Sequence, residues 1–234
     1  MWDPIDMTVD ESEEEEEVTI PTTEYRRLLP TPLPLRIRQM KRQWRQTNPG
    51  LTTSARHAYG EATTESLWKI WDAIRLEIQV NPGDKFLDWG CGAGKMLMSK
   101  QYFSPYPHIA SFGVEIDEHV FERVSRHIPL LGLTNVQLLR GDAADIQNWD
   151  SVTIVMQYDG GPQSHVEEPH RSIMQCLFRT ASVRIVFSTK LDVGLFHTYF
   201  DRSVTVDVTD WRVVRVHGLS FGGSKFIGYL WVRL

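Results

Sequence analysis

The sequence predicts an α/β protein with a seven-stranded sheet, and two observations carry this prediction. From about residue 60, short apolar runs typical of strands alternate with amphipathic helical segments, which is the pattern of parallel βαβ units. After Lys190 the rhythm changes to two β-rich runs with glycines between them and little room for a crossover helix. We therefore expect a parallel sheet with helices on both faces that ends in an antiparallel hairpin.

The predicted elements follow one another along the chain. An amphipathic helix over 62–78 leads into the sheet, because Leu67, Ile70, Trp71 and Ile74 recur on one helical stripe. Parallel strands are expected at 85–89, 109–116, 136–141, 152–157 and 184–190. The segments 118–128 and 170–180 read as helices, and the hairpin occupies 211–234. Five parallel strands and two hairpin strands make seven.

Length and composition place the protein among single-domain soluble proteins. A chain of 234 residues suffices for one domain with a full core, and no apolar run approaches the roughly 20 residues of a membrane-spanning helix. The N-terminus lacks the features of a secretory signal, so we expect an intracellular protein, nuclear or cytoplasmic. Cys91 and Cys176 are too few for a disulfide framework or a zinc site. We expect reduced thiols, no metal, no membrane contact and a monomer.

Charge divides the chain into three parts. Residues 1–24 hold ten carboxylates and no Lys or Arg, which predicts a disordered acidic tail. Residues 25–58 read as a basic, proline-containing linker, and residues 59–234 as the folded domain. Between Arg26 and Arg45 lie seven Lys or Arg residues, a candidate contact for a nucleosome, histone or nucleic acid. A linker whose charges only keep it soluble is the alternative, and both interpretations stay open.

The stretch "KFLDWGCGAGKM" at Lys85–Met96 places a carboxylate and three glycines where the first parallel strand turns into a helix. Open α/β sheets bind ligands at this edge. A triphosphate loop would need a glycine at Trp89 and a hydroxyl at Met96, and a dinucleotide loop would need its third glycine at Lys95. A carboxylate at Asp88 repels phosphate but attracts an amino group. These residues therefore favour S-adenosylmethionine, against which the backbone of Gly90 and Gly92 can lie closely.

Two further acids stand at the ends of the next two strands. Glu115 closes "GVE", where a carboxylate can accept both hydroxyls of a ribose. Asp142 follows in "RGD", where it can accept a hydrogen bond from the adenine amino group. An acid at a strand end is often only a helix cap. Three acids in order, at the ends of successive strands, favour a cofactor site.

At this point the sequence resembles the class I, seven-strand methyltransferases. It is most similar to the "disruptor of telomeric silencing" family of non-SET histone lysine methyltransferases, through "YGEATTESL" from Tyr59, "FLDWGCGAGK", "FGVE", "GD", "RIVFSTK" and the hairpin with "GLSF" and "GYL". The resemblance covers residue 59 to the C-terminus. It implies a Rossmann-like methyltransferase sheet and transfer of a methyl group to a lysine.

Carried over by position, the resemblance puts Glu61 in a loop over the cofactor, and Asp88, Gly90 and Gly92 at its methionine end. Glu115 and Asp142 would take the ribose and the adenine. At the end of the fourth strand the family has two asparagines and a phenylalanine, where this chain has Met156, Gln157 and Tyr158. We expect Gln157 to contact cofactor or acceptor, and Gln157 and Tyr158 to act in catalysis.

The last hairpin departs from the family at two positions. Phe221 and Gly228 replace the tryptophan and tyrosine that line the family's lysine channel. We expect Phe221, with Tyr158, to contact the substrate. The loss of size at Gly228 implies a wider channel or a substrate other than lysine.

Three functions remain open from the sequence. The first is a protein lysine methyltransferase that acts on chromatin and is guided by the basic segment. The second is an RNA or DNA methyltransferase in which Tyr158 stacks on a base, although "QYDGGP" lacks the [DN]PP[YF] turn that is usual there. The third is a cofactor-binding scaffold that has lost catalysis.

Overall fold

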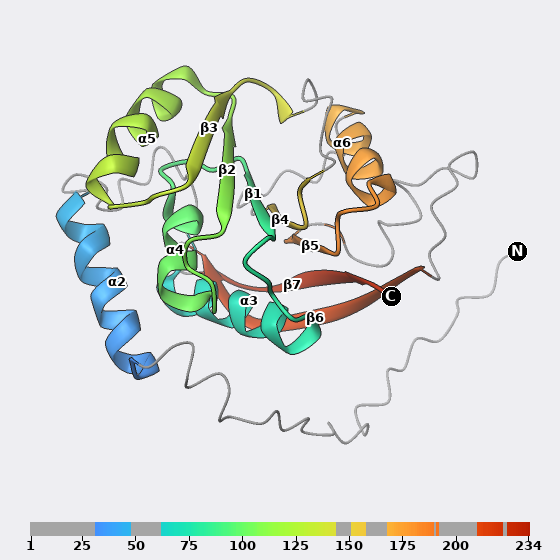
Figure 1. Ribbon diagram of the computed structural model, residues 1–234, viewed down its shortest axis with the longest axis horizontal. Coiled ribbons are helices and arrows are strands. Elements are labelled where there is room, and N and C mark those ends of the chain that lie inside the picture. Colours follow the sequence, from blue (N-terminus) through green and yellow to red (C-terminus); the bar gives the residue numbers. More distant parts are fainter. Residues whose placement is uncertain are drawn as a thin grey trace, which may run out of the picture.

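The computed structural model describes residues 31–47, 62–143, 151–157, 168–189, 191, 210–221 and 224–234, and leaves the side chains of 168–173, 221 and 224 undescribed. Figure 1 shows a twisted sheet flanked by helices. The helices are α2 (Leu33–Thr47), α3 (Thr64–Glu77), α4 (Lys95–Phe103), α5 (Glu118–Leu130) and α6 (Glu168–Arg179). The strands are β1 (Lys85–Trp89), β2 (Ala110–Glu115), β3 (Val136–Arg140), β4 (Ile154–Gln157), β5 (Ile185–Ser188), β6 (Trp211–Phe221) and β7 (Ser224–Arg233).

The seven strands form one sheet in the order β3-β2-β1-β4-β5-β7-β6. Strands β1 to β5 are parallel, and β7 runs antiparallel to both β5 and β6. The predicted fold class is thus confirmed. Because β7 lies between β5 and β6, the last strand of the chain is an inner strand of the sheet.

Two apolar cores cover the two faces of the sheet. One core joins alternate strand residues such as Phe86, Ile154 and Phe187 to α3, α4 and α5. The other joins the intervening strand residues, such as Leu87 and Val155, to α6 and to Trp231. Side chains alternate along a strand, so this parity also decides which face receives each polar residue at a strand end.

Helix α2 lies within the stretch for which the sequence predicts a linker. It packs against α3 and α4 through Met40 and Trp44, which are buried one turn apart. Arg36, one turn before them, is buried too and donates from Nε to the Thr31 carbonyl (2.9 Å) and from Nη1 to the Tyr102 carbonyl (2.7 Å). Pro34 is tolerated because it stands in the first turn. Across the described segments, no helix is long and apolar enough to cross a membrane.

Lys100 is fully buried between α4 and β2, and no carboxylate of the described residues pairs with it. Its Nζ donates to the Ile109 carbonyl and to the Ser111 hydroxyl, both at 2.6 Å. Burial penalises the charged ammonium and lowers the pKa of Lys100 from 10.5 to about 8. Folding near neutral pH therefore holds a costly charge in the core.

We predict that Lys100 makes stability rise with pH above 8. Between pH 8 and 10.5 the unfolded chain keeps the Lys100 proton while the folded protein releases it, so the free energy of unfolding increases with pH. Urea denaturation of wild type and Lys100→Met at pH 7 to 10 measures this difference. Wild type should gain stability relative to Lys100→Met as pH rises, and a constant difference would contradict the assignment.

Candidate functional site

The candidate site lies at the carboxyl ends of β1 and β4, where the strand order changes direction. Here Asp88 pairs with Met156, and Trp89 with Gln157. On the other side of β1, Asp88 pairs with Gly113 of β2, two residues before Glu115. The βαβ topology thus gathers polar residues from three strands at one edge.

Asp88 is buried and points to the α3–α4 face of the sheet. Its carboxyl group accepts a hydrogen bond from the Leu97 backbone N–H, but Oδ2 has no partner among the described residues. Burial, and secondarily the nearby Glu115 carboxylate, raise the pKa of Asp88 from 3.8 to about 8. A buried carboxyl oxygen without a partner is expensive, and a cationic ligand would satisfy it.

The glycine loop after β1 takes a conformation that side chains rarely adopt. Gly90, Gly92 and Gly94 have φ values of 75°, 52° and 86°. The N–H groups of Gly90 and Cys91 donate to the Val114 carbonyl at 3.0 and 2.9 Å, which ties the loop to β2. A Cβ built on Gly90 or Gly92 would meet no protein atom within 4 Å. Backbone strain and open space beside the loop, rather than crowding by protein, therefore explain these two glycines.

Glu115 holds the loop from the end of β2. Its Oε2 accepts from the Gly92 N–H (3.0 Å), and Oε1 accepts from the Asp117 N–H (2.9 Å). Each carboxylate oxygen can accept more than one hydrogen bond, so both can still receive ribose hydroxyls. Glu115 is therefore suited both to clamp the loop and to hold a sugar.

The next strand brings Asp142 to the same edge. The Gly141 N–H donates to the Glu115 carbonyl (3.0 Å), which fixes the turn that carries Asp142. Beside Glu115, the side chain of Ile116 is 66% exposed. This exposed apolar side chain, at the same edge as Glu115 and Asp142, offers a surface for a flat ring such as adenine. The sequence analysis does not single out Ile116, although its place after a strand-end acid could have indicated it.

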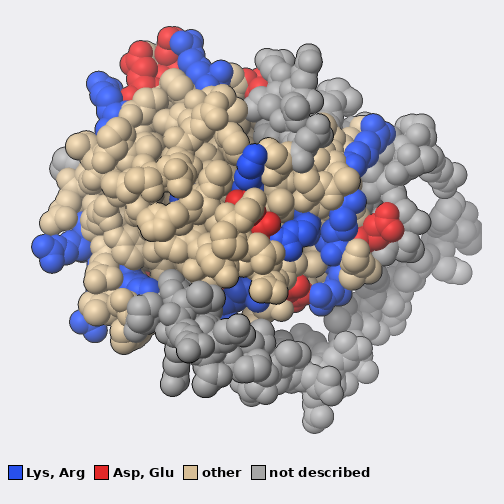
Figure 2. Space-filling view, in the orientation of Figure 1, with Lys and Arg blue, Asp and Glu red and all other residues tan. Residues whose placement is uncertain are grey.

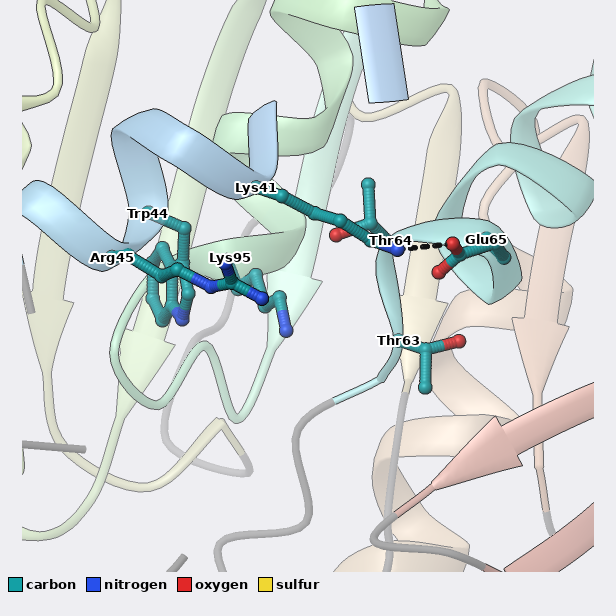
Figure 3. A pocket seen from close by; sticks show the side chains of 7 residues that line it. All are labelled: Lys41, Trp44, Arg45, Thr63, Thr64, Glu65 and Lys95. Atoms are coloured by element: carbon teal, nitrogen blue, oxygen red, sulfur yellow. Dashed lines mark hydrogen bonds and ion pairs between the residues drawn. The ribbon is translucent and has the colours of Figure 1, made fainter. Parts of the chain in front are cut away.

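A cavity of about 250 Å³ adjoins the end of the glycine loop (Figure 3). Its lining residues come from α2, α4 and the start of α3: Lys41, Trp44, Arg45, Thr63, Thr64, Glu65 and Lys95. Lys95 directly follows Gly94 and places its Nζ 5.5 Å from the centre of the Trp44 ring, while Lys41 pairs with Glu65. Lys95 is suited to bind a ligand carboxylate, a role that the sequence analysis missed because it considered only the ammonium group of the ligand.

Gln157 shares the edge with Asp88 but not its face. By strand parity its side chain points to the α6 face, where it is buried and its Oε1 accepts from the Ser188 hydroxyl (2.7 Å). Ser188 Oγ in turn accepts from the Leu191 N–H (3.1 Å). The loop after β5 therefore sets the orientation of the amide.

Three residues named from the sequence cannot be placed. Glu61 and Tyr158, and the side chain of Phe221, lie outside the described residues. Gly228 is described, and a Cβ there would lie 2.5 Å from the Phe187 ring and 2.8 Å from Leu219. The expectation that Gly228 widens a channel is wrong, because core side chains fill that volume.

The residues present fit S-adenosylmethionine at each of its charged or polar parts. Asp88 offers for the amino group a buried oxygen that has no partner among the described residues, and Lys95 offers a cation for the carboxylate. Glu115 offers two acceptor oxygens that suit a ribose, and Asp142 and Ile116 follow the ends of β3 and β2 at the same edge of the sheet. Within the described residues, no group of three or more His, Cys, Asp or Glu is placed to hold a metal ion.

Residues 83–153 match the sequence model of a family described as "Putative methyltransferase". A comparison with curated protein sequences finds no match.

Solved structures share the fold at low identity, each with a TM-score of 0.50. The methyltransferase domain of bacterial CtHen1-C is 14% identical and covers 73% of this chain and 97% of its own. TrmN from Thermus thermophilus is 16% identical, and the match covers 74% of this chain and 48% of TrmN. The methyltransferase subunit of a type I restriction-modification system from Streptococcus thermophilus is 14% identical, and the match covers 74% of this chain and 45% of that subunit.

The fold is the one that class I methyltransferases share, and the glycine loop lies in the segment that matches a methyltransferase family model. The partial family match and the shared fold support an S-adenosylmethionine-dependent methyltransferase, with S-adenosylmethionine as the cofactor. The identity of the methyl acceptor is a separate question, which the shared fold leaves open.

We predict that the affinity for S-adenosylmethionine depends on pH through Asp88. With a pKa of about 8, only a minor fraction of Asp88 is ionised at pH 6, and this fraction grows about tenfold per pH unit below the pKa. The ionised form attracts the ammonium group, so calorimetry should show up to tenfold tighter binding from pH 6 to pH 7. Asp88→Asn should bind at least about tenfold more weakly at pH 7, without this dependence. Glu122→Gln, an exposed carboxylate on α5, is the control, and pH-independent wild-type affinity would refute the assignment.

We predict that Glu115→Gln damages both the loop and the cofactor site. The new amide must turn its NH₂ toward the N–H of Gly92 or of Asp117, which leaves one donor unpaired. We expect a loss of about 1–3 kcal/mol in the free energy of unfolding and at least tenfold weaker cofactor binding. Glu118→Gln, whose half-exposed carboxylate pairs with Arg140, should change neither quantity appreciably. Equal effects of the two substitutions in urea denaturation and calorimetry would contradict the role of Glu115.

Proposed function

We propose that the enzyme methylates the side-chain amine of a lysine in a histone-type protein, which would place it on chromatin in the nucleus. The proposal starts from the resemblance of "YGEATTESL", "RIVFSTK" and the final hairpin to non-SET histone lysine methyltransferases. The cofactor residues are shared by many methyltransferases, so these segments carry the distinction.

One contact supports it, because it joins two of these segments. Ser66, at the start of α3, donates from Oγ to the Ser220 carbonyl (3.1 Å) and accepts from the Ser220 N–H (2.7 Å). The Thr63 N–H also donates to the Ser220 carbonyl, at 3.2 Å. Thr63 lines the cavity beside the glycine loop. The hairpin residue before Phe221 is therefore joined to the start of α3, next to the N-cap residue that lines this cavity.

Methyl transfer requires little acid–base catalysis by the protein. S-adenosylmethionine would supply a methyl group on a sulfonium: the free lone pair of the nucleophile forms the new bond to the methyl carbon, the carbon–sulfur bond breaks, and neutral S-adenosylhomocysteine leaves. A lysine has a reference pKa near 10.4, so the enzyme must bind it neutral, and an apolar channel does so by disfavouring the ammonium. Tyr158 and Phe221 are the residues we assign to the walls of that channel.

We assign Gln157 to the acceptor side of the site. Its amide points away from the face of Asp88, and Ser188 fixes its orientation. An amide can accept a hydrogen bond from a lysine N–H without taking its proton, which suits positioning of a neutral amine. This assignment separates Gln157 from the residues that hold the methionine end of the cofactor.

We predict that radiolabelled methyl from S-adenosylmethionine appears in a histone. Intact nucleosomes, free histones, tRNA and DNA are offered separately, with Gly90→Arg as the blank, because Gly90 has a positive φ and borders the open space beside the loop. We expect label in a histone. When a single acceptor lysine of that histone is replaced by arginine, the label should disappear and should not move to another band. Label only in nucleic acid would refute the lysine proposal. Cofactor binding with no label in any sample would refute it for this panel and favour a scaffold.

In the same assay Gln157→Ala should bind the cofactor normally and transfer methyl at least about tenfold more slowly, since proximity and orientation account for much of such a rate. Gln137→Ala, on the exposed side of β3, is the matched control. Full transfer by Gln157→Ala would remove this residue from the site.

A further inference from the structure

We propose that α2 carries a binding surface for the phosphate backbone of duplex DNA, formed by Arg38, Arg42 and Arg45. We call these three residues the arginine stripe. The inference rests on the proposed function for its setting, since nucleosomal DNA accompanies a histone acceptor. The binding surface itself lies on α2 alone.

The basic residues of α2 fall into two groups: those with partners inside the protein and those that are exposed. Arg36 is buried and its guanidinium binds backbone carbonyls, so it is a structural residue. Lys41 forms an ion pair with Glu65. The side chains of the arginine stripe are exposed, and within the described part of the chain none of them has a hydrogen-bond or ion-pair partner.

The arginine stripe lies on the face of α2 opposite to its packing face. Successive residues turn by about 100° around a helix, so positions 38, 42 and 45 fall within an arc of about 60°. The centre of this arc lies almost opposite to Met40, which is fully buried against the domain. Helix α2 contains no acidic residue. Figure 2 shows Lys and Arg side chains projecting at the edge of the molecule where α2 lies in Figure 1.

The spacing of the stripe matches that of phosphates. At 1.5 Å per residue, positions 38 to 45 span about 10.5 Å along the helix. One strand of B-DNA carries a phosphate about every 3.4 Å of its axis, hence about three over this length. Three guanidinium groups, each able to bind phosphate through two N–H groups, therefore face about three phosphates.

The helix is held rigidly enough to guide a substrate. Besides the two bonds from Arg36, Gln43 Nε2 donates to the Leu131 carbonyl (2.8 Å), and the Gln43 amide oxygen accepts from the Tyr102 hydroxyl. At the end of the stripe, Arg45 also lines the cavity that contains Lys95. DNA bound to the stripe would thus lie at a fixed position beside the cofactor site.

The test is the salt dependence of binding to a fluorescent DNA duplex of about 20 base pairs, with the full chain. The slope of log K against log salt concentration is negative, and each phosphate contact makes it steeper by about 0.9. The triple variant Arg38→Gln/Arg42→Gln/Arg45→Gln should therefore have a slope that is shallower by about 2.7. We expect its affinity at low salt to fall at least tenfold. Arg126→Gln/Arg179→Gln/Arg215→Gln removes the same charge from exposed arginines elsewhere and should change the slope little.

Three results would overturn the inference: equal loss in both triple variants, an unchanged slope in the stripe variant, or stripe-dependent binding of poly-glutamate or of an RNA duplex with no binding of DNA. Circular dichroism and calorimetry with S-adenosylmethionine show whether the stripe variant keeps its fold and cofactor site. Methyl transfer to free histones should survive in it, whereas transfer to nucleosomes should fall. Loss of the proposed lysine activity would instead remove transfer to both acceptors and leave DNA binding intact.

Discussion

A buried carboxyl group at the end of β1 governs the arrangement of the site. Asp88 and Glu115 lie close together, both buried, on a sheet face that is largely apolar. Burial, and secondarily the neighbouring Glu115 carboxylate, disfavour ionisation of Asp88 and raise its pKa. The fold tolerates the pair because backbone N–H groups satisfy most of its oxygens. A cationic ligand would supply the missing partner of the remaining Asp88 oxygen, and its binding should in turn stabilise the folded protein.

The glycine loop follows from this constraint. For Gly92 to present its N–H to Glu115, and for Gly90 and Cys91 to reach Val114, the chain must turn sharply directly after β1. Residues with positive φ make that turn, and the space beside them stays open. The acid, the turn and the open space are therefore parts of one arrangement. This explains why a single dozen-residue stretch carried so much of the functional prediction.

The sequence predicted features that depend on near neighbours and missed those that depend on distant ones. Strands and their order follow from periodicity and from the rules of βαβ units, and strand-end acids follow from the strands. Helix α2 escaped prediction because its buried stripe includes Arg36, whose partner Tyr102 is 66 residues away. Lys100 reads as a surface residue of α4 until Ile109 and Ser111 enclose it. The face of Gln157 depends on its register with Trp89, and a one-residue shift would reverse it.

Helix α2 connects these observations, because its two faces meet different demands. Its inner face is bound to α3 and α4, the two helices that begin at the cavity and at the glycine loop. Its outer face is free of acidic residues, and the arginines there form no ion pair with any residue that the structure describes. A flexible basic linker would attract a polyanion equally well but would not fix its position. The burial of Arg36, Met40 and Trp44 therefore turns general electrostatic attraction into a defined orientation of any bound polyanion relative to the cofactor site.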